Sequence, residues 1–173
     1  MIVTHPASLV KYLSFGAGLA NPTIQRMELP FGTTPVYSVL QALEAVPSVV
    51  EAWWSPHIWS GDTRASKAWE GSHGVVVDVD YCPAGNHTDM PNDIRARVSG
   101  LASAGQFPGN LFHTTPRGFR LIFVTDHTIL DRIVWKWAAT EVATQVERAI
   151  QFNLPGQGFV VDSSVQYDIA RLV

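Results

Sequence analysis

Two aspartates two residues apart, Asp78 and Asp80, follow a run of valines that begins at Val75. β-Branched residues favour strands, and side chains two apart on a strand lie on the same face of the sheet. Two carboxylates held this close repel each other, and burying them is costly unless a cation lies between them. Oxygen ligands of this kind suit Mg²⁺ or Mn²⁺. The alternative is a pair of solvated acids at a strand end, because Asp-x-Asp is a short pattern.

The second feature that could take part in chemistry is a glycine turn between two arginines. Arg117 and Arg120 flank Gly118, and the hydrophobic segment 119–124 follows. A guanidinium group matches the geometry of phosphate oxygens, so this segment predicts a phosphate-binding hairpin. The alternative is a hairpin whose arginines face water. His113, on the strand expected before the turn, is either part of the site or a histidine of the core.

A third acid completes the pattern. Asp162 follows Phe-Val-Val just as Asp78 follows the valine run, and Arg171 lies nine residues further on. By itself an acid at a strand end usually caps the next turn. Asp162 therefore becomes a candidate ligand only together with the other two acids.

The elements around these residues predict an α+β fold. Strands are expected over 75–80, 111–113, 119–124 and 159–161, with another beginning near 169. Helices are expected after Thr34-Pro35, from Asn92 to near Gly105, and from a cap at Asp126 to the stop at 155–156. Residues 1–34 contain either a helix over 7–13 or a strand near 25–30. This order predicts helices packed on one face of a mostly antiparallel sheet.

The amino-acid composition indicates which class of protein this chain belongs to. The 173 residues are 46% hydrophobic and 16% charged, which is typical of a compact globular chain, and the net charge is −3. Cations bound to a carboxylate site would offset that charge, so DNA is not excluded as a partner. A single cysteine, Cys82, excludes an internal disulfide and a multi-cysteine zinc site, so no zinc is expected. No apolar run reaches about 18 residues, so we expect a cytoplasmic protein without a membrane partner.

Six tryptophans are many for this length. Most are expected in the core. One or two members of the aperiodic segment 48–73 are candidates for stacking on bases. Those tryptophans are Trp53, Trp54, Trp59 and Trp69.

Together, in this order, the three segments resemble the archaeo-eukaryotic primase superfamily, specifically the primase-polymerase domains of phage and plasmid replication proteins. The first motif of that family is matched by Val77-Asp78-Val79-Asp80. The second, often Thr-Pro-Ser-Gly-Gly-Arg-His-Leu-Tyr-Phe, here reads Thr-Thr-Pro-Arg-Gly-Phe-Arg-Leu-Ile-Phe over 114–123. The third is matched by Val161-Asp162 and Ala170-Arg171-Leu172. The resemblance covers roughly residues 70–173.

The resemblance implies a set of roles. Catalysis would depend on two Mg²⁺ or Mn²⁺ ions held by Asp78, Asp80 and Asp162. The residues that would bind the nucleotide are Arg117, Arg120, His113 and Arg171. Where the family has a histidine this chain has Arg120, so either Arg120 or His113 takes that role.

The resemblance also implies an architecture and partners. The catalytic core over about 70–173 would be RNA-recognition-motif-like, with residues 1–50 as an N-terminal α/β extension, and 1–173 would form a single catalytic domain. Its substrates would be nucleoside triphosphates and single-stranded or primer-template DNA in the cytoplasm of a bacterial host. We expect the domain to belong to a longer replication protein with a helicase domain downstream.

Two other functions compete with this interpretation. Residues 117–123 also resemble the aromatic strand of RNA-recognition motifs, which would make the chain a single-stranded nucleic-acid-binding module without catalysis. Asp78 and Asp80 would repel RNA on such a sheet, which favours the enzyme. Another palm-like metal enzyme, a nuclease or a cyclase, is the third possibility. The chain has no His-hydrophobic-His pair, which argues against a rolling-circle nickase.

Overall fold

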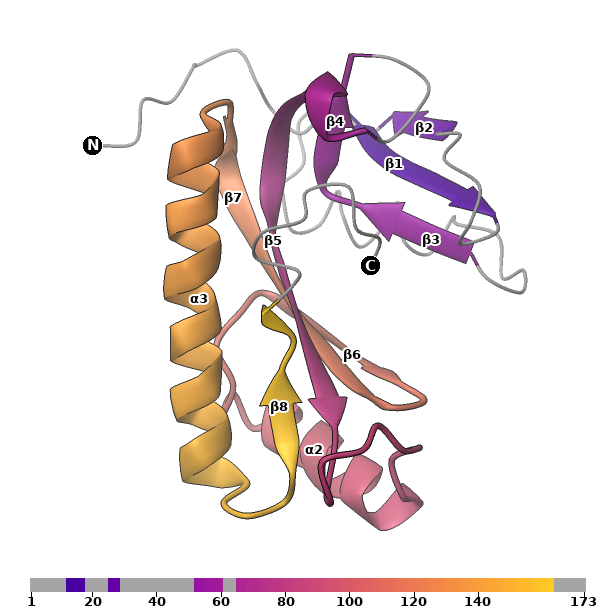
Figure 1. Ribbon diagram of the computed structural model, residues 1–173, viewed down its shortest axis with the longest axis vertical. Coiled ribbons are helices and arrows are strands. Elements are labelled where there is room, and N and C mark those ends of the chain that lie inside the picture. Colours follow the sequence, from indigo (N-terminus) through magenta and orange to yellow (C-terminus); the bar gives the residue numbers. More distant parts are fainter. Residues whose placement is uncertain (1–11, 18–24, 29–51, 61–64, 164–173) are drawn as a thin grey trace. The chain divides into compact units, whose positions relative to one another are not determined.

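The computed structural model describes residues 12–17, 25–28, 52–60 and 65–163. These residues form a mixed α+β structure with a curled antiparallel sheet, in the class that the sequence predicted (Figure 1). In chain order the elements are β1 (Tyr12–Ala17), β2 (Gln25–Glu28), β3 (Ala52–Ser55), β4 (His57–Trp59), the 3₁₀ helix η1 (Ser66–Ala68), β5 (Trp69–Tyr81), α2 (Asn92–Ser103), β6 (Leu111–Thr115), β7 (Gly118–Ile129), α3 (Arg132–Asn153) and β8 (Phe159–Val161).

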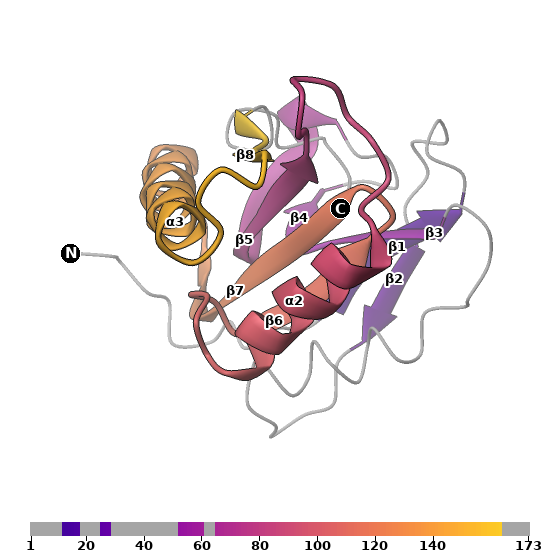
Figure 2. The same ribbon diagram turned by 90° about the horizontal axis from the view of Figure 1, so that it is seen from below.

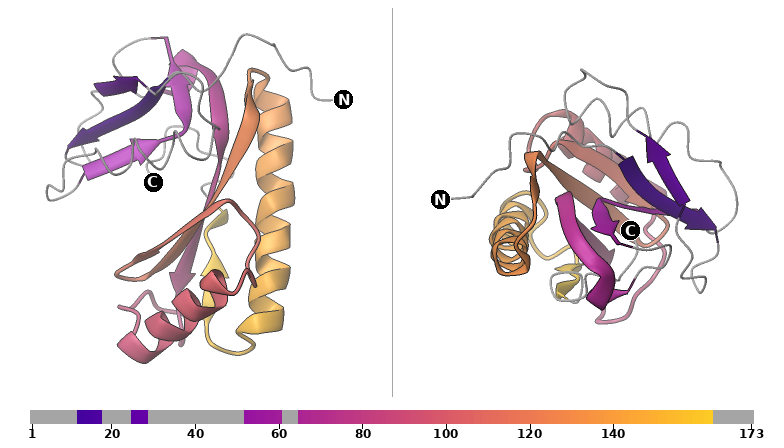
Figure 3. Two further views of the ribbon diagram at one scale, coloured as in Figure 1. Left: turned by 180° about the vertical axis from the view of Figure 1, so that it is seen from behind. Right: turned by 90° about the horizontal axis from the view of Figure 1, so that it is seen from above.

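The described strands belong to two sheets. One has the order β2-β1-β3, with both neighbours antiparallel to β1. The other has the order β4-β5-β7-β6, and β8 pairs with β5. β8 lies between the C-terminal part of α3 and β5 in the views from the front and from behind (Figure 3), and α2 lies against β6 (Figure 2).

The chain divides into two compact units, and β5, β7 and α3 each contribute to both. We call the part formed by residues 1–75, 124–136 and 168–173 the first unit. We call the part formed by 76–123 and 137–167 the second unit. The site residues predicted from the sequence belong to the second unit, with the exception of Arg171.

The second unit alternates apolar and polar side chains across its sheet. On β5, Val77 and Val79 are buried while Asp78 and Asp80 are partly exposed. On β7, Phe119 and Leu121 are buried while Arg120 is partly exposed. Successive strand residues point to opposite faces, so Asp78 and Asp80 share the face of β5 opposite to Val77 and Val79. Apolar side chains are buried on that face too, at Val76 of β5 and Ile122 of β7.

Aromatic side chains fill much of that core. Phe119 contacts the rings of Phe107, Phe112 and Phe159, with ring centroids 5.3, 5.6 and 5.5 Å away. Val98 of α2 and Val146 of α3 are fully buried as well. The strand that holds Asp78 and Asp80 is therefore anchored by its valines in a packed layer.

The first unit buries polar and aromatic side chains together. His57 of β4 contacts the ring of Trp135 with centroids 5.0 Å apart, and its Nδ1 accepts a hydrogen bond from Trp69 Nε1 at 3.2 Å. Trp135 Nε1 donates to the carbonyl oxygen of Gly74 at 3.1 Å. We call His57, Trp69, His73 and Trp135 the histidine–tryptophan cluster.

The start of the long helix α3 differs from the prediction. Asp126 does not cap a helix, because it lies inside β7, which continues to Ile129. The β-branched residues from 124 to 129 favour extended backbone. The cap is Asp131, whose Oδ1 accepts hydrogen bonds from the backbone N–H groups of Ile133 and Val134 at 2.7 and 3.1 Å.

Other helix and strand boundaries also differ from those predicted from the sequence. β5 begins at Trp69, six residues before the predicted start at Val75, because pairing with β4 extends it. Asn92 is the first residue of α2 and not its cap, since Pro91 occupies the cap position without a side-chain hydrogen bond. Gly105 follows the helix with a φ of 69°, as the helix stop predicted.

At the N-terminus, β2 confirms the strand expected near 25–30, while residues 12–17 form a strand where a helix over 7–13 was one alternative. The helix expected after Thr34-Pro35 and the strand expected near 169 lie outside the described residues.

Candidate functional site

Strand pairing in the second unit brings four of the predicted site residues into one row. Asp162 follows β8, and its backbone N–H donates to the carbonyl oxygen of Asp78 at 2.9 Å. On the other side of β5, the side chain of Asp78 meets that of Arg120 on β7. Arg120 in turn is directly opposite His113 on β6. We call Asp162, Asp78, Arg120 and His113 the charged row.

Asp78 and Arg120 form the best-defined contact of the row. Nη2 and Nε of Arg120 lie 3.2 and 3.3 Å from the same carboxylate atom, Oδ2 of Asp78. The two side chains are 24% and 19% exposed, for Arg120 and Asp78 respectively. Their charges are therefore partly screened from water yet remain accessible to a small ion.

Asp80 lies on the same face of β5 as Asp78 and has a different partner. Its Oδ2 is 3.4 Å from Nδ1 of His87, in the loop after the strand. His87 is 59% exposed and Asp80 is 25% exposed. Both carboxylates of the pair therefore have a basic side chain within reach, and both remain open to solvent on one side.

His113, partly buried on β6, has its pKa shifted by its surroundings. Burial lowers its pKa and so does the charge of Arg120, while the backbone of Thr114 and the carboxylate of Asp78 oppose the shift. Its Nδ1 lies 3.2 Å from the carbonyl oxygen of Thr114. A carbonyl can only accept, so Nδ1 donates and Nε2 keeps its lone pair.

Close approach of two backbones positions the row. A Cβ atom on Gly118 would lie 1.8 Å from the carbonyl oxygen of Val79, which no side chain permits. Next to it the backbone N–H of Tyr81 donates to the carbonyl oxygen of Arg117 at 2.6 Å. The glycine of the turn is therefore required so that β7 can lie against β5 and place Arg120 beside Asp78.

Arg95 of α2 fixes the same turn and was not identified from the sequence. Its guanidinium donates to the carbonyl oxygens of Thr115 and Pro116, at 2.7 and 3.2 Å. The backbone N–H of Met90 also donates to the oxygen of Pro116, at 2.8 Å. Nothing in the local pattern around Arg95 indicates this role, because its two partners in the turn are 20 and 21 residues away.

The remaining predicted residues are placed differently. Arg117 lies in the turn, 66% exposed, with Nε 3.7 Å from Oδ1 of Asp89. It is outside the charged row. Arg171 lies outside the described residues.

The aromatic candidates for base stacking are mostly unsuitable. Trp59 is 1% exposed and belongs to the core of the first unit. Trp69 is partly buried and engaged with His57. The side chains of Trp53 and Trp54 are not among those described. Phe119, which the RNA-binding interpretation requires on the open face, is fully buried in the core of the second unit.

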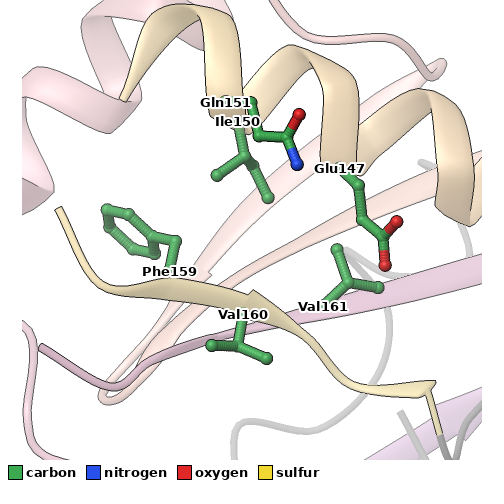
Figure 4. A pocket seen from close by; sticks show the side chains of 6 residues that line it. All are labelled: Glu147, Ile150, Gln151, Phe159, Val160 and Val161. Atoms are coloured by element: carbon green, nitrogen blue, oxygen red, sulfur yellow. The ribbon is translucent and has the colours of Figure 1, made fainter. Parts of the chain in front are cut away.

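A pocket of about 200 Å³ lies beside β8. Figure 4 shows side chains of α3 and β8 around it. The lining residues are Glu147, Ile150, Gln151, Phe159, Val160 and Val161. None of the predicted site residues lines this pocket.

Over the described ranges, no three acidic, histidine or cysteine side chains are grouped closely enough to hold a metal ion together. Asp78, Asp80 and Asp162 are brought to neighbouring positions but not into one such group. In the part of the chain that the structure describes, no helix is both long and apolar enough to cross a membrane.

Comparisons with known proteins give no match. No family model fits the chain, and neither the curated proteins nor the solved structures include one that is significantly similar.

Proposed function

We propose that this chain is the catalytic domain of a primase-polymerase, a nucleotidyltransferase with an RNA-recognition-motif-like core. The elements of the second unit follow the order β5-α2-β6-β7-α3-β8, and its strands lie in the order β8-β5-β7-β6. This order supports the proposal, because a β-α-β-β-α-β split fold would have the same one. Residues 1–50 would form the N-terminal extension of this core.

One observation supports the proposal most: the carboxylate of Asp78 on β5 lies beside the guanidinium of Arg120 on β7, and a second carboxylate, that of Asp80, lies on the same face of β5. Asp78, Asp80 and Arg120 come from the first two motifs of the resemblance, 42 residues apart for Asp78 and Arg120. A site for nucleotidyl transfer needs acidic groups for cations and basic groups for phosphates close together. The charged row contains both.

Carboxylate oxygens are the kind of ligand that divalent cations prefer, although Asp78, Asp80 and Asp162 are not grouped closely enough in this structure to hold one ion together. Asp78 and Asp80 offer carboxylate oxygens on one face of β5, and Asp162, which follows β8, joins the backbone of Asp78 through a hydrogen bond of 2.9 Å. The guanidinium of Arg120 neutralises the charge of Asp78 in this structure. Mg²⁺ or Mn²⁺ bound to Asp78, Asp80 and Asp162 would stabilise charge on the attacking and leaving oxygens.

The remaining side chains of the site would bind the nucleotide. In the proposed reaction a primer 3′-hydroxyl attacks the α-phosphate of an incoming nucleoside triphosphate, and pyrophosphate leaves. Arg120 and Arg117 would neutralise the triphosphate through their guanidinium forks. In its neutral form with the proton on Nδ1, His113 would offer Nε2 as a hydrogen-bond acceptor to the nucleotide. Template DNA and a downstream helicase domain would be the partners.

A binding module without catalysis receives less support. RNA-recognition motifs stack bases on aromatic side chains of the open sheet face. In this chain Phe119 has the corresponding motif position, but it packs against Phe107, Phe112 and Phe159. The open face presents Asp78, a group that repels phosphates.

Primer extension with Mg²⁺ or Mn²⁺ tests the proposal. We expect the wild-type chain to extend a primed template, and Asp78→Asn and Asp80→Asn to reduce extension about a hundredfold or more. Asp126→Asn is the control, because this exposed acid of β7 lies in the first unit and should leave extension unchanged. Circular dichroism confirms that each variant is folded.

Equal extension by wild type and both site variants contradicts the metal-site role. Shortening of the primer in place of extension, lost in the same two variants, would assign the site to a nuclease. Absence of any reaction on DNA by a folded wild-type chain contradicts the proposed function.

A further inference from the structure

Strand β8 has a free edge on the side away from β5. Hydrogen bonds at both ends of the strand fix its register. Asp162 donates its backbone N–H to the carbonyl oxygen of Asp78 at 2.9 Å. Before the other end of β8, the backbone N–H of Cys82 donates to the carbonyl oxygen of Gly158 at 2.6 Å. Bonded and non-bonded residue pairs alternate along an antiparallel ladder, so every second residue of this segment bonds to β5.

The residues between these two ends follow the same alternation. Val160 is opposite Asp80 and forms the bonded pair in the middle. Phe159 and Val161 belong to non-bonded pairs, so their N–H and C=O groups point away from β5. Over the described ranges, none of these four groups has a hydrogen-bond partner. The free edge therefore offers two donors and two acceptors to a neighbouring strand.

The sequence of β8 lacks the usual protection of an edge strand. Edge strands that stay unpaired commonly have a charged residue, a proline or a bulge. Residues 157–161 read Gln-Gly-Phe-Val-Val, without charge or proline, and the register with β5 is regular. Val160, in the centre, is 54% exposed. An uncharged edge with an exposed apolar residue at its centre fits another β-strand.

We propose that the free edge of β8 is a dimer interface that pairs with β8 of a second copy of this chain. A two-fold axis at Val160 places Phe159 of each copy opposite Val161 of the other. Each of these two pairs exchanges two hydrogen bonds, so the free backbone groups of both copies are satisfied at once.

The side chains of β8 fit the same axis. Figure 4 shows Phe159 and Val161 directed toward α3 and Val160 directed away from it. The axis therefore sets Phe159 beside Val161 of the second copy on the α3 side of the sheet. Aromatic and β-branched residues form stabilising cross-strand pairs of this kind. On the other face, the exposed Val160 meets Val160 of the second copy and loses contact with water.

The polar residues of α3 beside the edge are also complementary across the axis. Glu147 and Gln151 line the pocket next to β8. Glu147 lies over Val161, and Gln151 lies further along the helix in the direction of Phe159 (Figure 4). A two-fold axis at Val160 exchanges these two levels, so it brings Gln151 of one copy toward Glu147 of the other. The amide donates and the carboxylate accepts, which suits a contact between the two copies.

This inference goes beyond the proposed function and is independent of it, because it uses no side chain of the charged row and no nucleotide. Sedimentation equilibrium of the full chain tests it. The paired strands are short, so the interface lies at the small end of the usual range, and we expect a Kd of about 10 µM.

A charge exchange at Val160 tests the axis. Val160→Lys and Val160→Asp each place two like charges opposite each other, so each should weaken the dimer about tenfold or more. An equimolar mixture of the two variants should restore it, because opposite charges then face each other. Trp137→Lys is the matched control: it introduces the same cation at a 61% exposed position of α3 and should change Kd less than about twofold. Circular dichroism confirms that each variant is folded.

Restoration by mixing supports the proposed register, because a residue meets its own copy only at the two-fold axis. A wild-type chain that stays monomeric up to about 200 µM overturns the proposal. So does a dimer that both Val160 variants leave intact, a mixture that fails to recover, or a Trp137→Lys variant that dissociates as readily.

A disulfide replaces the charge exchange if either charged variant does not fold. Val160→Cys in a Cys82→Ser background places two thiols opposite each other at the axis, and diamide accepts their two hydrogen atoms as the bond forms. A disulfide-linked dimer of the full chain supports the axis. Its absence, at protein concentrations where wild type is dimeric, overturns the proposal.

Discussion

The polar side chains of the two units differ in burial and in charge. In the first unit His57 and His73 are 6% and 2% exposed, and burial lowers their pKa to about 3 and about 4. In the second unit Asp78 and Arg120 keep about a fifth of their side chains exposed and neutralise each other. The same strand, β5, thus carries a neutral polar group in a core and, five residues later, a charged group on an open face.

This difference separates groups that hold the fold from groups that are available for chemistry. His73 Nδ1 lies 3.3 Å from Thr128 Oγ1, inside the first unit and away from water. Such a group stabilises a particular packing, and its removal affects folding. A basic partner of Asp80, His87, lies in an exposed loop, and the Asp80 side chain is 25% exposed. Its removal should affect ligands far more than folding.

The largest effect is expected where two backbones of the second unit meet. Gly118→Ala would force a Cβ atom against the carbonyl of Val79, 1.8 Å away, so β7 must move away from β5. We expect a loss of more than about 4 kcal/mol in the free energy of unfolding, measured by urea denaturation. Gly71→Ala is the comparison in the first unit, since its Cβ would lie 3.0 Å from the oxygen of Ile129 and requires only a small shift.

If Gly118→Ala lost no more free energy of unfolding than Gly71→Ala, the charged row would not depend on this close approach.

The second effect distinguishes a structural tryptophan from an exposed one on the same helix. Trp135→Phe removes a hydrogen bond to Gly74 and part of the packing around His57. We expect it to reduce the free energy of unfolding by about 2 kcal/mol. Trp137 is 61% exposed, so Trp137→Phe should change that free energy by less than about 0.5 kcal/mol. Equal losses in urea denaturation would contradict the described burial.

The third effect concerns acid. His57 and His73 have folded pKa values of about 3 and about 4, below the ordinary value of 6.5 that they regain on unfolding. Below pH 6.5 the unfolded chain therefore binds protons that the folded chain does not, and stability falls as pH falls. Each histidine contributes a slope of up to about 1.4 kcal/mol per pH unit between pH 6 and pH 4.5.

His73→Gln should reduce this slope by up to one histidine's share in urea denaturation at a series of pH values. His127→Gln, at an exposed position of β7, should leave it unchanged. An identical slope in wild type and His73→Gln would mean that His73 titrates alike in both states.

The smallest effect on stability is expected where the effect on activity is largest. Asp80→Asn should change the free energy of unfolding by less than about 1 kcal/mol, because its contact with His87 is solvated. The same variant should lose primer extension. A loss of stability near that of Trp135→Phe would place Asp80 with the structural groups of the first unit and weaken the contrast between the units.

Some features of this protein follow from local sequence alone. The valine run with alternating aspartates predicted a strand with carboxylates on one face. The structure has that strand, with Asp78 and Asp80 on one face and Val77 and Val79 on the other. The hairpin over 111–124, the helix stop at Gly156 and the strand before Asp162 were also predicted and confirmed. Each depends on a periodicity or on one residue's backbone preference, which neighbours in sequence decide.

Other features depended on tertiary structure. The prediction of a helix cap at Asp126 was wrong because pairing extends β7 and leaves Asp131 as the cap. Phe119 and Arg120 are adjacent in sequence, and only the side on which the core forms decides that Phe119 is buried and Arg120 meets Asp78.

The order of strands in a sheet sets contacts between residues that are far apart in the chain. The contact of Arg120 with Asp78 spans 42 residues, and that of Arg95 with Pro116 spans 21. Local propensity contains no information on which strand becomes the neighbour of which, because that choice minimises exposed apolar surface over the whole unit. The sequence alone therefore determined which residues carry charge on a strand face, and the tertiary structure decided which of those charges meet.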